Sequence, residues 1–260
     1  MQVDFKGLWW MFLLVAIFSY LIGNVNFARI ISKKLNRDIT KEGSGNPGTM
    51  NMSRTFGLKI GLLTFILDVF KGALPTLIVK ILFKDLIFAG STLHVSVMAQ
   101  YIAGFFVILG HIFPVIYSFK GGKGIACSIG LFLVTQPLVG VVSTLLALGF
   151  ILLTAMGSMG SMIAITPPAI AELISLYKLG FIQELSLEFG TIFFIVTEHI
   201  IFLIMLLVWY ASRNNLTKLI SGDEHETSWL DMIAARIMQK KHEKLVKKEK
   251  ALKKQNEKKN

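Results

Sequence analysis

Long hydrophobic segments, separated by short polar ones, make up most of the chain. The first runs from Gly7 to Ala28 without an acidic or basic residue. At about 1.5 Å per residue, a helix of that length crosses a bilayer core of about 30 Å. A cleavable signal peptide has a shorter apolar region, of about 7–15 residues, with a basic start and a small-residue cleavage site. Neither flank is evident, so the pattern predicts a retained transmembrane helix.

Charged residues and helix breakers place the remaining spans. The stretch from Gly124 to Ala171 lacks acidic and basic residues and is too long for one helix. Its natural breaks are Gln136-Pro137, because proline lacks an N–H group, and the glycine cluster 157–160. The first helix of this stretch is short, at about 21 Å. The pattern predicts an all-α, polytopic integral membrane protein of about seven transmembrane helices. They lie in 7–28, in about 58–83, within 86–119, three in 124–171, and in about 189–212.

Basic residues gather on one face of this arrangement. With seven spans, the segments after the first and third spans, the glycine cluster and the C-terminus share a face. Lys33, Lys34 and Arg37 lie in the first of these segments, and Lys120 and Lys123 in the second. By the positive-inside rule that face is cytoplasmic, which predicts an N-terminus outside and a C-terminus inside. Much of the net charge of +11 belongs to the tail and does not indicate nucleic acid as a partner.

Composition supports a membrane domain and narrows the chemistry. Hydrophobic residues make up 53% of the chain and charged residues 17%, which does not fit a water-soluble domain. The single cysteine, Cys127, excludes an internal disulfide and a multi-thiolate metal site. No cluster of histidines and cysteines has zinc spacing, so we expect no metal.

Two glycine-rich segments lie on the predicted cytoplasmic face. Residues 43–54 read GSGNPGTMNMSR and begin with G-x-G-x-x-G, but they follow a membrane span and not a strand, so the dinucleotide reading fails. Residues 110–124 read GHIFPVIYSFKGGKG. Here Lys120 and Lys123 bracket glycines whose N–H groups can turn toward an anion, which suits phosphate. The segment is not a Walker A loop, because Ile125 replaces the Mg²⁺-binding hydroxyl residue. A plain cytoplasmic loop, in which glycine and lysine are common, is the alternative.

Together with NLTKLISGDE at 215–224, these segments resemble the three signature loops of the bacterial acyl-phosphate:glycerol-3-phosphate acyltransferases, the PlsY family. DVFKG at 68–72 and GSMGS at 157–161 also resemble family stretches, and the resemblance covers roughly residues 8–226. It implies a seven-helix enzyme of the bacterial plasma membrane that transfers a fatty acyl group from acyl phosphate to the 1-hydroxyl of glycerol 3-phosphate. The product is lysophosphatidic acid, the first intermediate of phospholipid synthesis. The family uses no metal, nucleotide or other cofactor.

The resemblance also implies roles for individual residues. An acyl phosphate is already activated, so the site need only hold two anionic substrates together and offset developing charge. The second loop is expected to hold mainly phosphate and the first mainly glycerol phosphate, while the acyl chain lies in an apolar groove open to lipid. His111 could equally be a structural, turn-stabilising residue. The candidate catalytic residues are Ser44, Asn51, Arg54, His111 and Lys123. The candidate substrate-binding residues are Gly45, Asn46, Gly48, Lys120, Gly121, Gly122, Gly124, Ser158, Asn215 and Lys218.

The chain also departs from the family pattern. Ser212 stands where members usually have histidine, Lys218 where they have arginine, and Cys127 where they have threonine. Lysine keeps the charge but loses the bidentate fork that arginine offers a phosphate. A catalytically weakened paralogue and a non-catalytic membrane scaffold are therefore alternatives. A small polytopic transporter is a third, although no inverted repeat with matched broken helices is visible.

Three other features lie outside the signature loops. Asp68 and Lys71, three apart on one helix face, are expected to pair within the bundle. Glu198-His199, in the middle of the last span, is expected to make a buried interhelical hydrogen bond. The sequence predicts an acyltransferase-like domain over 1–228 and a basic, helical tail over 229–260. That tail either lies on anionic membrane or is solvated.

Overall fold

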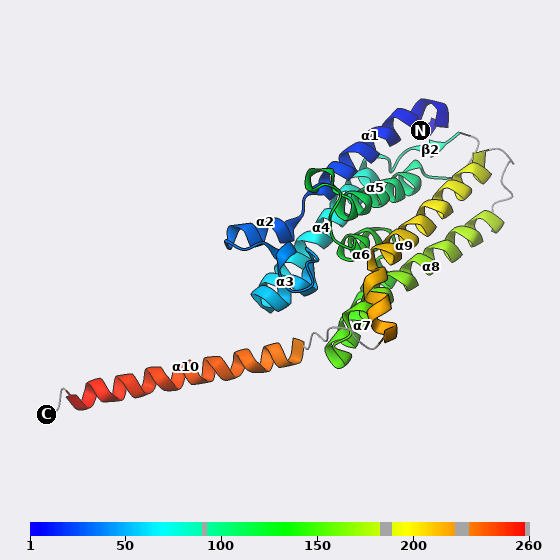
Figure 1. The fold of residues 1–260 in the computed structure, drawn as a ribbon. Coiled ribbons are helices and arrows are strands. Elements are labelled where there is room, and N and C mark those ends of the chain that lie inside the picture. Colours follow the sequence, from blue (N-terminus) through cyan, green and yellow to red (C-terminus); the bar gives the residue numbers. More distant parts are fainter. Residues whose placement is uncertain (90–92, 183–188, 222–228, 258–260) are drawn as a thin grey trace.

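A computed structural model describes residues 1–89, 93–182, 189–221 and 229–257 of the chain. Helices account for most of them, and α1, α4, α5, α8 and α9 run side by side as one bundle (Figure 1). The α-helices are α1 (Phe5–Asn24), α2 (Phe27–Lys34), α3 (Thr49–Phe56), α4 (Leu58–Leu82), α5 (Val95–Ile112), α6 (Ile125–Thr135), α7 (Pro137–Thr154), α8 (Gly157–Ile182), α9 (Phe189–Ser221) and α10 (Trp229–Glu257). The short helical turns η1 (Ile39–Lys41) and η2 (Val115–Tyr117) and the strands β1 (Gln2–Val3) and β2 (Ile87–Phe88) complete the described elements.

Six helical segments among the described residues are long and apolar enough to cross a membrane. They are Gly7–Lys34, Leu58–Leu82, Val95–Tyr117, Pro137–Thr154, Gly157–Tyr177 and Ile195–Asn214. The remaining apolar helix, α6, has 11 residues and confirms the expected short helix before Pro137. The polytopic all-α class is therefore confirmed, whereas the count of seven spans and the orientation of the termini stay predictions.

The breaks between helices follow local chemistry. Helix α1 ends at Asn24, earlier than predicted, and Asn26 caps α2 by accepting a hydrogen bond of 3.0 Å from the Arg29 N–H. Pro137 is the first residue of α7, where its missing N–H costs nothing. The next break lies at Ala155, which has φ 59°. The glycine cluster predicted as the break instead forms the first turn of α8.

Small residues bring α4 and α6 close together. A Cβ atom on Gly72 would lie 2.1 Å from the Cys127 carbonyl oxygen, and one on Gly130 would lie 2.1 Å from the Val69 carbonyl oxygen. Neither position tolerates a side chain, as is common where membrane helices pack backbone to backbone. This close approach sets Asp68 of α4 beside Cys127 of α6, under the site described below.

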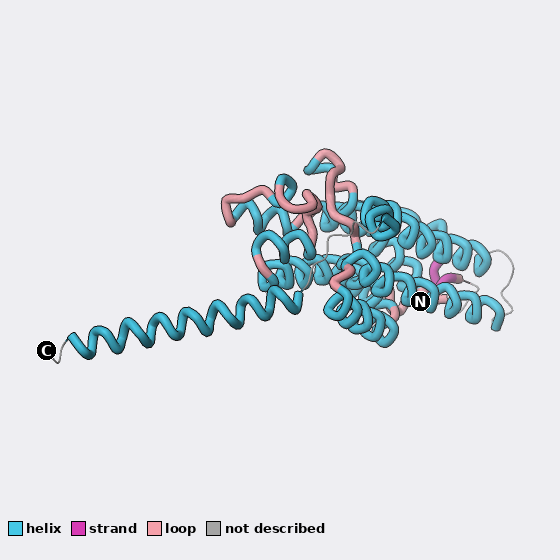
Figure 2. The backbone as a smooth tube through the Cα atoms, turned by 60° about the horizontal axis from the view of Figure 1, so that its bottom comes forward, coloured by secondary structure: helices cyan, strands magenta, loops and turns pink. Residues whose placement is uncertain are grey.

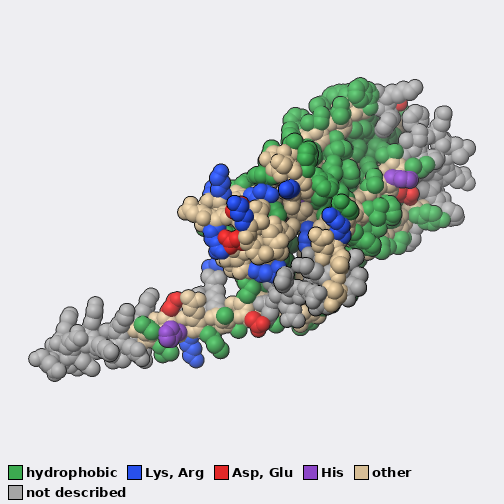
Figure 3. Space-filling model, viewed as in Figure 1, with side chains coloured by type: hydrophobic (Ala, Val, Ile, Leu, Met, Phe, Trp, Pro, Cys, Tyr) green, Lys and Arg blue, Asp and Glu red, His purple; other side chains and the backbone are tan. Residues whose placement is uncertain are grey.

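The two ends of the bundle differ in chemistry. At one end β1 pairs in parallel with β2, and at the other α2, α3 and most of the loops gather (Figures 1 and 2). Lysine and arginine side chains cluster over the α2–α3 end, while the flank of the bundle is almost wholly hydrophobic (Figure 3). A hydrophobic flank with a basic end is the surface expected of a membrane-embedded protein. Helix α10 runs away from the bundle, and among the described residues its contacts include α4 and α7 (Figure 1).

Candidate active site

The first glycine-rich segment folds around a buried amide. Asn51, on α3, accepts a hydrogen bond of 3.1 Å from the Ser44 N–H and donates to the carbonyl oxygens of Ile39 (3.2 Å) and Glu42 (2.9 Å). A Cβ atom on Gly43, which has φ 54°, would lie 2.2 Å from Asn51 Oδ1. The Asn51 amide therefore holds the loop in shape, and the loop in turn presents Ser44 to the cavity described below.

Local contacts fix the segment that leads into this loop. Arg37 forms an ion pair with Glu42, in which two nitrogens of the guanidinium group donate hydrogen bonds to the two oxygens of the carboxylate. Asp38 Oδ1 accepts hydrogen bonds from the Thr40 hydroxyl (2.7 Å) and the Thr40 N–H (3.0 Å), and these bonds lower the pKa of the Asp38 carboxyl. Both contacts hold the segment before Gly43 in place. The residues of this loop that line the cavity come after that segment.

The second glycine-rich segment folds around His111 in a different way. The N–H groups of Gly121 and Gly122 each donate a hydrogen bond of 3.1 Å, to the carbonyl oxygens of Ile112 and His111. A Cβ atom on Gly122 would lie 2.2 Å from His111 Nε2. These glycines therefore let the loop close over the imidazole, and the expectation that their N–H groups face a phosphate is wrong. Of this loop, Lys123 and Gly124 reach the cavity.

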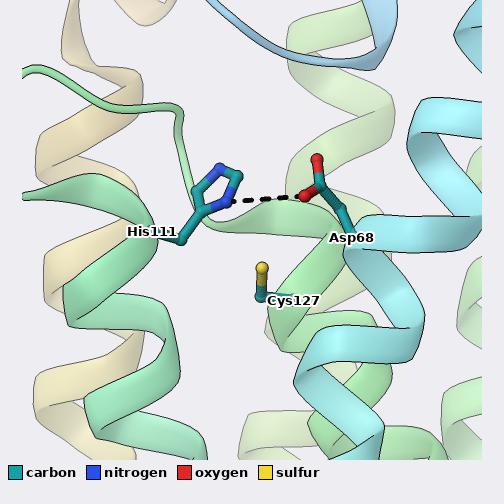
Figure 4. Close-up of side chains that lie close together, drawn as sticks. All are labelled: Asp68, His111 and Cys127. Carbon is teal, nitrogen blue, oxygen red and sulfur yellow. Dashed lines mark ion pairs between the residues drawn. The ribbon is translucent and has the colours of Figure 1, made fainter. Parts of the chain in front are cut away.

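A buried polar cluster lies beneath the second loop. Asp68 Oδ1 lies 3.0 Å from Lys71 Nζ and 3.7 Å from His111 Nδ1, and Figure 4 shows the carboxylate and imidazole facing one another with Cys127 beside them. Lys71 Nζ also donates to the carbonyl oxygen of Val25 (2.6 Å), the residue that follows α1. The expected Asp68–Lys71 pair is thus confirmed, and it ties α1, α4 and α5 together.

The same cluster has the composition of a metal site but not its electrostatics. Asp68, His111 and Cys127 each offer a ligand atom, and these atoms lie within 4.8 Å of one another. The Lys71 ammonium already neutralises the carboxylate at 3.0 Å and repels a cation. The arrangement therefore fits an internal Asp68–Lys71 ion pair that lies beside His111.

A cavity of about 370 Å³ joins these parts. Its lining residues form two groups: a polar, cationic group, called the polar end, and an apolar group supplied by α4 and α7, called the apolar arm. Ser44, Asn46, Gly48, Asn51, Ser53, Arg54, Asp68, His111, Lys123, Gly124, Gly157, Ser158 and Ser161 form the polar end. Leu58, Leu62 and Phe65 of α4 and Ala147, Leu148, Ile151 and Leu152 of α7 line the arm.

The first turn of α8 contributes to the polar end of the cavity. Gly157, Ser158, Gly160 and Ser161 all line the cavity, and a Cβ atom on Gly160 would lie 2.3 Å from the Ile151 side chain. The N-terminus of a helix carries unpaired N–H groups and a positive dipole end, both of which suit an anion. The glycine cluster thus lets α8 begin close against α7 and directs its N-terminus at the cavity.

Comparison with known proteins now decides the family. The sequence profile described as glycerol-3-phosphate acyltransferase matches residues 13–222. The chain belongs to the glycerol-3-phosphate acyltransferase family. It is 32% identical to the glycerol-3-phosphate acyltransferase of Aquifex aeolicus over 82% of this chain and 97% of that protein. It is 35% identical to that of Finegoldia magna over 82% of this chain and 94% of that protein.

Solved structures of this acyltransferase family share the fold. The crystal structure of PlsY (YgiH), an integral membrane glycerol 3-phosphate acyltransferase, in its glycerol 3-phosphate form aligns with a TM-score of 0.66 at 30% identity. The alignment covers 86% of this chain and 98% of that chain. A second structure of PlsY, in its lysophosphatidic acid form, aligns with a TM-score of 0.65. The present protein is therefore an integral membrane enzyme of this family, as the sequence predicted.

The cavity gathers most of the acyltransferase residues expected from the sequence. Ser44, Asn46, Gly48, Asn51, Arg54, His111, Lys123, Gly124 and Ser158 all line it. Gly45, Lys120, Gly121 and Gly122 are absent from its described lining. Lys120 is exposed, and its carbonyl oxygen accepts a hydrogen bond of 2.8 Å from Arg29. The side chains of Asn215 and Lys218 lie outside the described residues.

Two expectations about α9 fail, and one lining residue was missed. The third signature segment is helical through Ser221, where a loop was expected. His199 is exposed and contacts the carbonyl oxygen of Ile195 in its own helix, at 2.6 Å, so the buried interhelical hydrogen bond is wrong for this residue. Trp229, the first residue of the basic tail, lines the cavity. No local sequence pattern predicts that Trp229 lines the cavity, because the other lining residues lie far from it in the sequence.

Proposed function

We propose that the protein transfers a fatty acyl group from acyl phosphate to the 1-hydroxyl of glycerol 3-phosphate, giving lysophosphatidic acid and inorganic phosphate. One observation carries this proposal: a single cavity joins a cationic, hydroxyl-rich end to an apolar arm inside a membrane-spanning bundle. A phosphate and a fatty acyl chain need these two environments side by side. PlsY, the related protein of known structure, has glycerol 3-phosphate and lysophosphatidic acid forms, which supports the same acceptor and product here.

The reaction is a displacement at the acyl carbonyl carbon. The glycerol oxygen forms a bond to that carbon, and the bond from the carbon to the phosphate oxygen breaks. The phosphate leaves with the electron pair, and its oxygens accept the proton that the hydroxyl group loses. Because phosphate is a good leaving group, the site needs no covalent enzyme intermediate and supplies orientation and charge.

Charge at the polar end opposes the repulsion between the two phosphates. Arg54 lines the cavity from α3, Lys123 from the second loop, and the N-terminus of α8 adds backbone donors near Ser158. Arginine binds an oxyanion through two parallel N–H groups, whereas lysine acts as a point charge. We assign Arg54 and Lys123 to the phosphates, and Ser44 and Asn46 to the glycerol hydroxyl groups.

His111 and Asn51 act through their neighbours in this proposal. The imidazole has Asp68 on its Nδ1 side and Gly122 against Nε2, which leaves it little freedom to accept a proton from substrate. The side-chain amide of Asn51 makes its hydrogen bonds to backbone groups in and before the first loop. We therefore propose both as positioning residues, His111 for the loop that carries Lys123 and Asn51 for the loop that carries Ser44.

The arm between α4 and α7 is proposed to hold the acyl chain. Its lining is aliphatic and aromatic, and the side chain of Leu62, itself part of that lining, and that of Leu145 of α7 present exposed apolar surface. In a bilayer such surfaces contact lipid, so a chain in the arm reaches the hydrocarbon without crossing water. With this assignment, membrane lipid is a partner of the protein. The protein is located in the bacterial plasma membrane, which it crosses several times.

Donor discrimination tests the proposed function. Protein purified in detergent is given glycerol 3-phosphate with palmitoyl phosphate or palmitoyl-CoA, without added metal or nucleotide. Lysophosphatidic acid should form from the acyl phosphate alone, because the polar end is compact and suits a phosphate. Product from palmitoyl-CoA alone overturns the proposed donor. Folded protein that consumes neither donor supports the scaffold or transporter alternative.

A further inference from the structure

The cavity has a lining residue that lies beyond the family match. The family profile ends at residue 222, and Trp229 begins α10, yet Trp229 contributes to the cavity wall. Helix α10 contacts α4 and α7, the same two helices that supply the apolar arm. Trp229 therefore lines the cavity from the helix that contacts both α4 and α7, the two helices whose apolar residues are proposed to hold the acyl chain.

The rest of α10 does not pack on the bundle in this way. Leu230, Ile233 and Ile237 have exposed fractions of 52%, 38% and 62%. Figures 1 and 3 show the helix running away from the hydrophobic flank. Trp229, by contrast, is half-buried. The contact is thus made by the first turn, and Trp229 is the large side chain of that turn that faces the cavity.

The indole ring has a polar group that is left without a partner. Trp229 Nε1 is buried and makes no hydrogen bond to any residue that the structure describes. A buried donor without an acceptor is energetically unfavourable. Tryptophan suits a place with an apolar and a polar side, because its ring packs against hydrocarbon while its N–H seeks an acceptor. A ligand with a hydrocarbon chain and an oxygen-rich head supplies both.

We propose that Trp229 contacts the acyl substrate: its ring packs against the start of the acyl chain, and its Nε1–H donates a hydrogen bond to an oxygen of the acyl head group. This inference rests on the proposed function for the identity of the ligand. It makes the beginning of the tail part of the binding site for the acyl donor. The glycerol 3-phosphate end of the cavity, at Ser44 and Arg54, does not depend on it.

Tryptophan fluorescence tests the contact without an activity assay. The chain has four tryptophans, so a protein with Trp9→Phe, Trp10→Phe and Trp209→Phe retains Trp229 as its single tryptophan. Lysophosphatidic acid added to this protein in detergent should shift or quench the emission, whereas glycerol 3-phosphate should leave it unchanged. A matched protein that keeps Trp10, whose side chain is 45% exposed on α1, and carries Trp229→Phe should not respond. Emission that ignores lysophosphatidic acid overturns the contact.

Kinetics of two substitutions test the hydrogen bond and the packing separately. Trp229→Phe keeps an aromatic ring and loses the N–H, so the KM for acyl phosphate should rise about two- to tenfold. Trp229→Ala should raise it further, while the KM for glycerol 3-phosphate stays within about twofold. The control is Leu230→Ala, on the exposed side of the same turn, which should change neither KM.

The outcomes separate this inference from the proposed function. If the unaltered protein transfers no acyl group, the proposed function fails, and the fluorescence response still decides whether Trp229 contacts an acyl-bearing ligand. If acyl transfer occurs and Trp229→Phe and Trp229→Ala leave the KM for acyl phosphate unchanged, the inference is wrong while the function stands. An equal rise in both KM values, with a lower melting temperature, shows a merely structural role and also overturns it.

Discussion

The two glycine-rich loops look alike in sequence and do different things in the fold. The first wraps around the Asn51 amide, and residues on both sides of that amide, Ser44 and Arg54 among them, face the cavity. The second closes over His111, and the N–H groups of Gly121 and Gly122 donate hydrogen bonds to carbonyl oxygens at the end of α5. Lys123 and Gly124 of this loop line the cavity. Glycine therefore serves as a close-packing residue in the second loop. A glycine–lysine pattern can therefore mark a loop beside a cavity without telling which of its atoms face that cavity.

The largest expected effect separates cavity cations from surface cations. Lys123→Ala and Arg54→Ala should each lower kcat/KM by about 10²-fold or more, as the loss of one charge-stabilising donor often does. Lys120→Ala should have a clearly smaller effect, because this lysine is exposed three positions away in the same loop. Steady-state rates of lysophosphatidic acid formation measure all three. Equal losses for Lys120→Ala and Lys123→Ala would contradict the geometry of the second loop.

Removal of the first loop's internal amide should destabilise the protein. Asn51→Ala deletes three hydrogen bonds and leaves the carbonyl oxygens of Ile39 and Glu42 without their donor. At roughly 0.5–1.5 kcal/mol per bond, the free energy of unfolding should fall by about 2–4 kcal/mol. Thermal unfolding in detergent measures this change. Asn46→Ala, which also lines the cavity, should lower activity with little change in stability, and the reverse pattern would refute the positioning role of Asn51.

The second loop should be sensitive to a single methyl group. Gly122→Ala places a Cβ atom 2.2 Å from His111 Nε2, and the imidazole is buried against Asp68. Overpacking of this kind typically costs about 1–3 kcal/mol, and displacement of the loop should also move Lys123. The control is Gly149→Ala in α7, where an added Cβ meets nothing within 4 Å. Comparable melting temperatures for the two variants would show that His111 is not enclosed by the loop.

The smallest expected effect concerns the outer support of the second loop. Arg29 donates a hydrogen bond of 2.8 Å to the Lys120 carbonyl oxygen and lies 4.6 Å from the centre of the Tyr117 ring. Arg29→Gln should raise the KM for the phosphate-bearing substrates about two- to fivefold, because it loosens the loop without removing Lys123. Arg29→Lys should recover part of the loss. A fall in kcat with no change in KM would assign Arg29 a different role.

Some features of the fold follow from sequence because they depend on one segment at a time. Hydrophobic length places the helices, and Pro137 starts α7 as expected. Ala155 could not be found in this way, because alanine favours helices, whereas here it has a positive φ at the break between α7 and α8, which pack against one another. The glycine cluster at 157–160 is predicted as a break because glycine is unfavourable inside a helix. In the fold it forms the first turn of α8, where Gly160 lies close against Ile151 of α7.

The site shows the same division between local and long-range information. Signature loops carry most of the residues of the polar end, and each loop folds around a partner of its own, Asn51 or His111. The direction of the Gly121 and Gly122 N–H groups depends on the end of α5, which no glycine pattern encodes. Trp229 reaches the cavity through contacts of α10 with α4 and α7, and sequence alone gives no sign of them.

An isotope experiment tests the central claim most directly. Glycerol 3-phosphate labelled with ¹⁸O at the 1-hydroxyl is converted by the purified protein with unlabelled acyl phosphate, and the products are weighed by mass spectrometry. Attack of the glycerol oxygen on the acyl carbon predicts that all the label appears in the ester of lysophosphatidic acid and that the released phosphate carries none. Label in the phosphate, or lysophosphatidic acid that has lost the label, would contradict acyl transfer in this cavity.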